Sequence, residues 1–178
     1  QGYNYATASI GASHCYGYAA QDIFGAPIPR PTDRFSEENA DIVIFNQDGT
    51  AWKECGVSCT FSGGWGWTHL FGKLVAAARG IDKLEDDAYL DKVGERMFNL
   101  ERAFNVRVGF RRIDDFLPER IRTEGLHTRQ ADGEGQTVAH NDEFLDKYYE
   151  LRGWTRDGIP TAEKLTELGL DFAVKDMA

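Results

Sequence analysis

Two short segments of the chain hold the side chains that are best suited to chemistry. Residues 53–61 read Lys-Glu-Cys-Gly-Val-Ser-Cys-Thr-Phe, which places Cys55 and Cys59 directly after the carboxylate of Glu54. Thiolates are soft donors that bind zinc or iron–sulfur clusters. A C-x-x-x-C pair by itself is a weak signal, so the pair marks a candidate metal site that other parts of the chain must complete.

The second segment contains His14 and Cys15, within residues 5–18, which are rich in Gly, Ala, Ser and Tyr. Small residues let a ligand or a neighbouring backbone approach closely, and an imidazole there can move protons near pH 7. A structural histidine is the alternative interpretation. A Cys–His nucleophile is not expected, because adjacent side chains rarely face each other and no orienting acid is evident.

The cysteines allow two further interpretations. His14, Cys15, Cys55 and Cys59 form a possible three-sulfur, one-nitrogen zinc set, provided that the two segments meet in space. The simpler alternative is that Cys15 and Cys55 are small buried hydrophobic residues. Three cysteines are an odd number, which argues against a fully paired disulfide framework and favours a reducing compartment or a metal role.

Composition and charge restrict the class of protein. The 178 residues are 42% hydrophobic, enough for an apolar core. The net charge of −9, with no basic run longer than Arg111-Arg112, lacks the cationic footprint that nucleic acid binding requires. No apolar run approaches the roughly 20 residues that span a bilayer, and no signal segment is evident. We therefore expect a cytoplasmic protein, and the start at Gln1 without Met leads us to expect a piece of a longer polypeptide.

Apolar periodicity and capping residues predict a mostly α fold with irregular loops. No stretch shows the alternation of a convincing strand. The predicted helices run from an N-cap at Ser36 to about Trp52, from Thr68 to near Gly80, from Asp86 to Phe104, from an N-cap at Asn141 to Gly153, and from Pro160-Thr161 to Gly169. The first of these helices delivers Glu54 and the two cysteines at its C-terminal end.

Two helices carry apolar faces that predict the core. In the helix over 86–104 the stripe consists of Leu90, Val93, Met97, Leu100 and Phe104. In the helix that starts at Asn141 the face consists of Phe144, Tyr148 and Leu151. Residues 63–67 are predicted to form an irregular loop, and residues 122–140 an exposed excursion.

Four ordered segments together resemble the tungsten-dependent aldehyde:ferredoxin oxidoreductases. They are residues 5–15, which end in Gly-Ala-Ser-His-Cys, residues 95–107, residues 114–120 and residues 148–161. The most specific match is Glu-Arg-Met-Phe-Asn-Leu-Glu-Arg-Ala-Phe-Asn-Val-Arg at 95–107. The resemblance implies that residues 1–178 are the helical C-terminal region of such an enzyme, with about 1–60 facing the cofactors and 61–178 forming a helical part.

The resemblance also implies cofactors and the residues that hold them. Members of the family bind tungsten, or molybdenum, through two pterin dithiolenes and carry a [4Fe–4S] cluster. A D-x-x-G-L/V-C motif supplies a pterin contact and the last cluster ligand. Alignment without gaps from Asn46 places the motif's Asp at Glu54, its Gly at Val57, its Leu/Val at Ser58 and the ligand Cys at Cys59. Glu54, Val57 and Ser58 depart from the motif, and Cys55 is an additional thiol.

The implied reaction is the oxidation of an aldehyde to a carboxylic acid. The family's active-site histidine corresponds to His14, which would donate or accept a proton. Electrons would pass through the cluster to ferredoxin or an iron–sulfur subunit, and the remainder of the chain or complex would supply the other cluster ligands. We therefore expect no activity from these 178 residues alone.

Three points about the assembly and the reaction stay open. A homo-oligomer is compatible with the resemblance. One alternative function is the tungsten subunit of an aromatic acyl-CoA reductase-type complex. The other is a helical scaffold or binding module without a cofactor.

Overall fold

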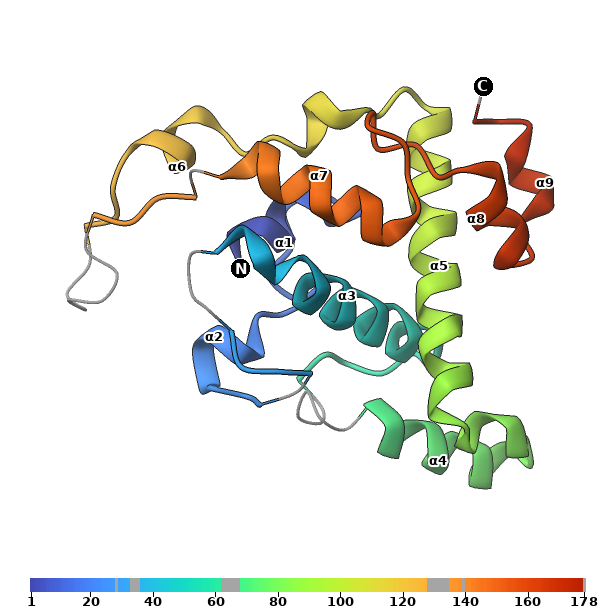
Figure 1. Ribbon diagram of the computed structural model, residues 1–178. Coiled ribbons are helices and arrows are strands. Elements are labelled where there is room, and N and C mark those ends of the chain that lie inside the picture. The colour runs from blue at the N-terminus through green and yellow to red at the C-terminus, as the bar shows by residue number, and fades with distance from the viewer. Residues whose placement is uncertain (28, 33–35, 62–67, 128–134, 139, 178) are drawn as a thin grey trace.

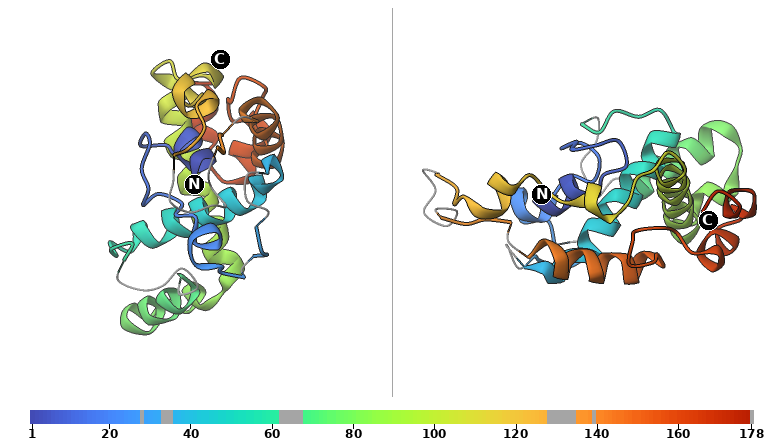
Figure 2. Two further views of the ribbon diagram at one scale, coloured as in Figure 1. Left: turned by 90° about the vertical axis from the view of Figure 1, so that its left-hand side faces the viewer. Right: turned by 90° about the horizontal axis from the view of Figure 1, so that it is seen from above.

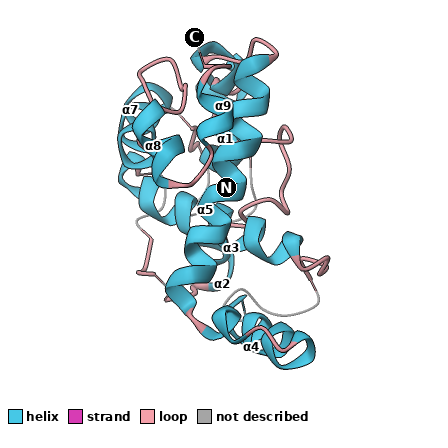
Figure 3. Ribbon diagram, turned by 90° about the vertical axis from the view of Figure 1, so that its right-hand side faces the viewer, coloured by secondary structure: helices cyan, strands magenta, loops and turns pink. Residues whose placement is uncertain are grey.

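The described part of the chain folds into helices and the loops between them, with no β-strand (Figures 1 and 3). The computed structural model describes all residues except 28, 33–35, 62–67, 128–134, 139 and 178. Its α-helices are α1 (Gly2–Thr7), α2 (Ala20–Phe24), α3 (Ala40–Cys55), α4 (Thr68–Arg79), α5 (Asp87–Arg107), α6 (Glu119–Thr123), α7 (Asn141–Arg152), α8 (Ala162–Glu167) and α9 (Asp171–Val174). Single 3-10 turns lie at Glu37–Asn39, Asp82–Glu85 and Arg112–Asp115. The predicted mostly α fold is confirmed.

Local capping interactions set some of the predicted helix ends, whereas α3 begins only at Ala40 and ends at Cys55, and α5 continues to Arg107. The side chain of Ser36 accepts a hydrogen bond from the backbone of Glu38 at the 3-10 turn that leads into α3. Asp86 accepts from the backbone N–H of Ala88 at the start of α5. Gly153 ends α7 in the left-handed conformation, with φ 68°, which glycine adopts without steric cost. The residues that form each of these caps lie within a few positions of one another in the sequence, so the caps could be predicted.

The long helix α5 is crossed by α3, and a glycine makes the crossing possible (Figure 1). A Cβ atom on Gly94 would lie 2.0 Å from the backbone oxygen of Asp48 in α3. Any larger residue at this position would push the two backbones apart, because heavy atoms cannot approach so closely. Gly94 therefore fixes how near α3 and α5 can lie.

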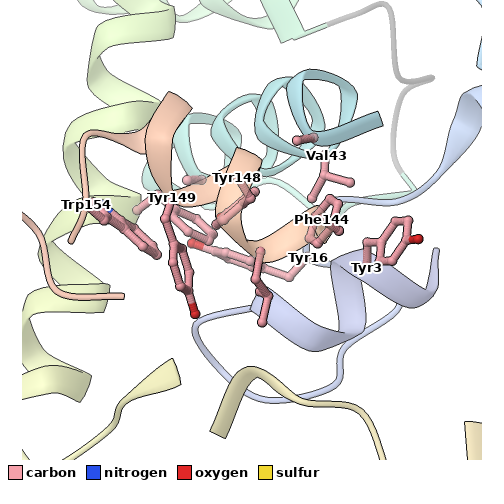
Figure 4. Close-up of a cluster of buried hydrophobic side chains, with 11 residues drawn as sticks. Tyr3, Tyr16, Val43, Phe144, Tyr148, Tyr149 and Trp154 are labelled. Carbon is pink, nitrogen blue, oxygen red and sulfur yellow. The ribbon is translucent and has the colours of Figure 1, made fainter. Parts of the chain in front are cut away.

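Aromatic side chains from α1, α7 and the loops fill the main core against α3 and α5 (Figure 4). The ring of Tyr3 stacks on that of Phe144 with centroids 4.0 Å apart. Trp154, just after α7, meets Tyr148 edge to face at 5.6 Å, and its indole Nε1 donates to Asn99 Oδ1 of α5 at 2.7 Å. Each large ring thus packs across two elements, and the polar indole atom keeps a partner.

Two buried arginines pair with acids inside this core. Arg152 donates to Asp48 Oδ1 at 2.6 Å and to Gln47 Oε1 at 3.1 Å. Arg102 donates to both oxygens of Asp115, at 2.9 and 2.8 Å. Burial raises the pKa of Asp48 to about 6, although the charge of Arg152 opposes the shift. Burial also raises the pKa of the Asp115 carboxyl, against the opposing effect of Arg102. These ion pairs tie α7 to α3 and the 3-10 turn at 112–115 to α5.

The predicted apolar stripe on α5 is only half correct. Leu90 is fully buried, but Leu100 and Phe104 are 40% and 61% exposed. The buried positions toward the C-terminal end of α5 are instead Phe98, Asn99, Arg102, Ala103 and Val106. Here α8 and α9 cover a different side of α5 (Figures 1 and 2). Leu100 and Phe104 line a surface cavity of about 540 Å³ together with Ile10 and Phe172.

Three smaller predictions about the C-terminal half also need correction. Asn141 is the first residue of α7 and not its cap, because the N-cap residue is His140. Leu151 is 49% exposed, whereas the neighbouring Leu145 is fully buried. The helix predicted to start after Thr161 is confirmed as α8 and begins with Thr161 as its N-cap, but α9 follows it and was not predicted.

Some predictions fall where the structure gives no description. The loop over 63–67 lies outside the described residues, and so does much of the excursion over 122–140. In the described residues, no helix has both the length and the apolar character needed to cross a membrane.

Candidate functional site

The C-terminal end of α3 presents the acid and the thiols of the first candidate segment. Glu54 and Cys55 occupy the last turn of α3, and both side chains are exposed. Val57 follows with φ 55°, and no other non-glycine residue of the described ranges has a positive φ. A β-branched residue in this left-handed conformation is strained. The backbone therefore has the conformation that favours glycine at the position where the family motif has its Gly.

Lys53 connects the end of α3 to the segment that contains Cys59. Its Nζ donates to the backbone oxygen of Thr60 at 2.9 Å, which holds the segment after Cys59 against the end of α3. Burial lowers the pKa of the Lys53 ammonium, and the nearby Cys59, Glu54 and Cys15 oppose this shift. The ammonium thus lies among groups that become negative on ionisation.

The loop that carries His14 meets this segment. The His14 and Phe61 rings have centroids 6.4 Å apart, and Tyr18 lies 6.5 Å from His14 and 6.1 Å from Phe61. His14 itself is exposed. The tertiary fold thus places His14 on the same face as the segment that includes Cys59, although 45 residues separate them in the sequence (59 − 14).

His14 and Cys15 face each other, contrary to the expectation from their adjacency. The Cys15 Sγ and His14 Nε2 atoms lie 3.3 Å apart. The loop turns between these residues, so the general rule for neighbouring side chains fails here. The imidazole consequently has one nitrogen directed at a thiol.

The structure does not assemble the zinc set. Cys55 donates to the thioether sulfur of Met97 in α5, with the two sulfurs 2.9 Å apart. Partial burial raises the pKa of the Cys55 thiol, which disfavours its thiolate form. Within the described ranges, no three His, Cys, Asp or Glu side chains are arranged to hold one metal ion. Cys55 is directed toward α5 and away from such a set.

The interpretation of Cys15 and Cys55 as buried hydrophobic residues is also wrong. Cys55 is exposed and Cys15 is half-buried. All three cysteines fall within the described residues, and none is in a disulfide. The expectation that disulfides do not organise this chain therefore holds for the described structure.

The donor atoms at this face fit one edge of a larger cofactor site. Cys59 offers one exposed sulfur, whereas a [4Fe–4S] cluster takes four cysteine ligands. The exposed carboxylate of Glu54 can accept hydrogen bonds from a pterin. The chemistry of these side chains therefore fits one ligand position of a cluster and one pterin contact.

Sequence patterns did not identify Lys53, Tyr18 and Phe61 as residues of this face. A lysine in the last turn of a helix often binds nearby carbonyl oxygens, which was the available signal for Lys53. The two aromatic residues carried no such signal, because their meeting with His14 depends on how the loops fold together.

Comparisons with known proteins identify relatives of this chain. Residues 1–170 match the family described as aldehyde ferredoxin oxidoreductase, domains 2 and 3. The chain is 37% identical over 172 residues to the tungsten-containing aldehyde ferredoxin oxidoreductase of Pyrococcus horikoshii, covering 96% of this chain and 28% of that protein. It is 34% identical over 171 residues to the enzyme of the same name from Thermococcus kodakarensis, covering 95% and 27%.

A solved structure is also similar to this chain. It is the active site complex BamBC of benzoyl coenzyme A reductase in complex with 1,5-dienoyl-CoA. The TM-score is 0.58 at 28% identity, over 85% of this chain and 21% of that chain. The chain thus spans just over a quarter of the length of the curated relatives that it matches.

Proposed function

The chain belongs to the aldehyde ferredoxin oxidoreductase family, and on this premise we propose that it is the helical C-terminal part of a cytoplasmic tungsten–pterin oxidoreductase that oxidises aldehydes to carboxylic acids. The observation that carries this proposal is the meeting of the His14 loop with the end of α3 and the segment that holds Cys59. One exposed face thereby presents a proton carrier, a carboxylate and a thiol together.

Each of these side chains has a proposed role. Cys59 provides one ligand to a [4Fe–4S] cluster, and the Lys53 ammonium beside it stabilises the negative charge of the ligand set. Glu54 binds the pterin, and the turn at Val57 and Ser58 brings the backbone close to it. When bound, the tungsten–pterin supplies the two-electron redox chemistry, and the cluster passes the electrons on singly to ferredoxin or an iron–sulfur subunit.

The proposed role of His14 follows from the balance of the reaction. An aldehyde and water give a carboxylic acid, two protons and two electrons, so protons must leave the site. The His14 imidazole is exposed, and an imidazole is a side chain that can accept a proton in general acid–base catalysis. Its Nε2 lies 3.3 Å from Cys15 Sγ, and this contact orients the ring.

Replacement of Cys59 tests the cluster assignment. In the complete natural protein, Cys59→Ser is expected to remove or shift the electron paramagnetic resonance signal of the cluster, because oxygen is a poor substitute for a thiolate ligand. Cys55→Ser is the matched control, since that thiol faces Met97, and its signal should match the wild type. Identical signals from both variants and the wild type would refute the role of Cys59.

A second function has support from the structural similarity. The benzoyl coenzyme A reductase complex covers 85% of this chain at 28% identity, so the chain could instead serve an aromatic acyl-CoA reductase. That function needs additional electron carriers, and co-purifying flavin and iron–sulfur subunits would favour it. Elemental analysis of the natural protein separates both enzymes from a scaffold, which would contain neither tungsten nor iron.

A further inference from the structure

One carboxylate of α5 binds the loop of His14 from both sides. Ser9 Oγ and Tyr16 OH, five residues before and two residues after His14, both donate to Oε2 of Glu101, each at 2.5 Å. One turn further along α5, Asn105 Nδ2 donates to the backbone oxygen of Ser9 at 2.6 Å. The two ends of the loop are therefore held on α5 by Oε2 of Glu101, and Asn105 adds a further hydrogen bond to Ser9.

The surroundings of Glu101 strengthen these bonds. Tyr16 is 1% exposed and stacks on Phe98 of α5, with ring centroids 5.9 Å apart. Burial raises the pKa of the Tyr16 phenol, and Glu101 raises it further, so Tyr16 remains a hydrogen-bond donor. Bonds from a hydroxyl to a carboxylate are about twice as strong as bonds between neutral groups.

The loop between Ser9 and Tyr16 is also held by contacts with α1. Asn4 Nδ2 of α1 donates to the backbone oxygen of Ser13 at 3.2 Å. Gly17, with φ 92°, lies so close to the core that a Cβ would stand 2.3 Å from Asn4 Oδ1. The segment from Ser9 to Gly17 is thus tied to α1 and α5 on either side of His14, while the imidazole itself stays exposed.

We infer that Glu101 is a positioning residue that sets where the His14 imidazole lies relative to the candidate cofactor face. The inference rests on the proposed function for the role of His14, but the anchoring of the loop is independent of it. Glu101 acts through Ser9 and Tyr16. Loss of the Glu101 charge weakens the hydrogen bonds from Ser9 and Tyr16 at the same time. A shift of about 1 Å in the position of a catalytic group can lower the rate roughly a hundredfold.

The test compares two Glu→Gln variants of α5 in the complete natural protein. Glu101→Gln keeps the size of the side chain and removes the negative charge that binds both hydroxyls. Glu95→Gln is the matched control, because Glu95 pairs with Lys164 and not with the loop. Hydrogen–deuterium exchange over residues 9–18, tungsten and iron content, and kcat and KM for an aldehyde are measured for each.

For Glu101→Gln we expect faster exchange over residues 9–18. We also expect kcat per bound tungsten to fall by roughly ten- to a hundredfold, with KM and metal content unchanged. The control should match the wild type in exchange and kcat. Tyr16→Phe removes one of the two donors and should give a smaller fall of kcat in the same direction. Combined with Glu101→Gln it should add little, because both changes act through one carboxylate.

The outcomes that would overturn the inference are distinct. If hydrogen exchange and kcat are both unchanged in Glu101→Gln, the inference is refuted. It is also refuted if kcat falls only in proportion to a loss of tungsten or iron, because Glu101 would then have a purely structural role. The exchange measurement does not depend on turnover. If the natural protein oxidises no aldehyde while exchange still rises, the proposed function fails and the anchoring of the loop by Glu101 is retained.

Discussion

The crossing of α3, α5 and α7 and the face around His14 use charged groups in opposite ways. At the crossing, Arg152 of α7 pairs with Asp48 of α3, and beside it Arg102 of α5 pairs with Asp115, at 3% and 1% exposure. At the face, Glu54, His14 and Cys59 are all exposed. Buried charges must be paired because desolvation is costly, so the arginines and acids of the crossing serve the structure. Groups that bind a cofactor or move a proton must instead remain accessible.

Strongly shifted pKa values are not confined to the candidate functional site of this chain. At the buried crossing, burial raises the pKa of Asp48 to about 6, although this acid belongs to the core and not to the candidate site. At the face, the clearest unusual feature is the backbone of Val57, with φ 55°. Perturbed groups are candidates for function only when they also lie in an accessible place.

Removing Arg102 should cause the largest loss of stability. Arg102→Ala leaves the Asp115 carboxylate buried without its cation, and breaking such a pair costs about 3–5 kcal/mol of unfolding free energy. Thermal or denaturant unfolding of the whole protein measures the loss. Arg120→Ala, which breaks the exposed pair with Glu124, should change stability very little. Similar small losses for both variants would contradict the structural role of the buried pair.

Adding one methyl group at the crossing should have a smaller effect. The Cβ atom of Gly94→Ala would lie 2.0 Å from the backbone oxygen of Asp48, so α3 and α5 must separate. Overpacking of this kind costs about 1–3 kcal/mol. Arg96→Ala, at an exposed position of the same helix, is the control and should stay within about 0.5 kcal/mol of the wild type. A neutral Gly94→Ala would mean that the helices are less tightly held than the structure indicates.

Relieving the strained turn should give the smallest effect, with the opposite sign. Val57→Gly removes the left-handed strain of a β-branched residue and is expected to raise the unfolding free energy by about 1 kcal/mol, after the entropic cost of glycine is subtracted. The same substitution at Val108, where φ is −90°, should lower it by about 0.5–1 kcal/mol. If both changes destabilise the protein equally, the turn at Val57 is not strained.

Local sequence information determined the helices and the candidate residues. Asp86 and Gly153 were predicted correctly as helix ends, because the groups that set a helix end lie a few residues apart. Ser36 caps the 3-10 turn that precedes α3, and the α-helix itself begins at Ala40. The family resemblance supplied His14 and Cys59 as candidates. Their roles remain predictions, because they depend on the cofactors that the family resemblance implies.

The tertiary structure alone decided which surfaces are buried and which segments meet. Periodicity marked Leu100 and Phe104 as core residues, but burial depends on where α3, α8 and α9 pack, and they leave these two side chains exposed. The ring contact of His14 with Phe61 and the two hydrogen bonds that Glu101 accepts from Ser9 and Tyr16 join segments 47 to 92 residues apart. No local pattern encodes such pairings, because their geometry follows from the packing of the whole chain.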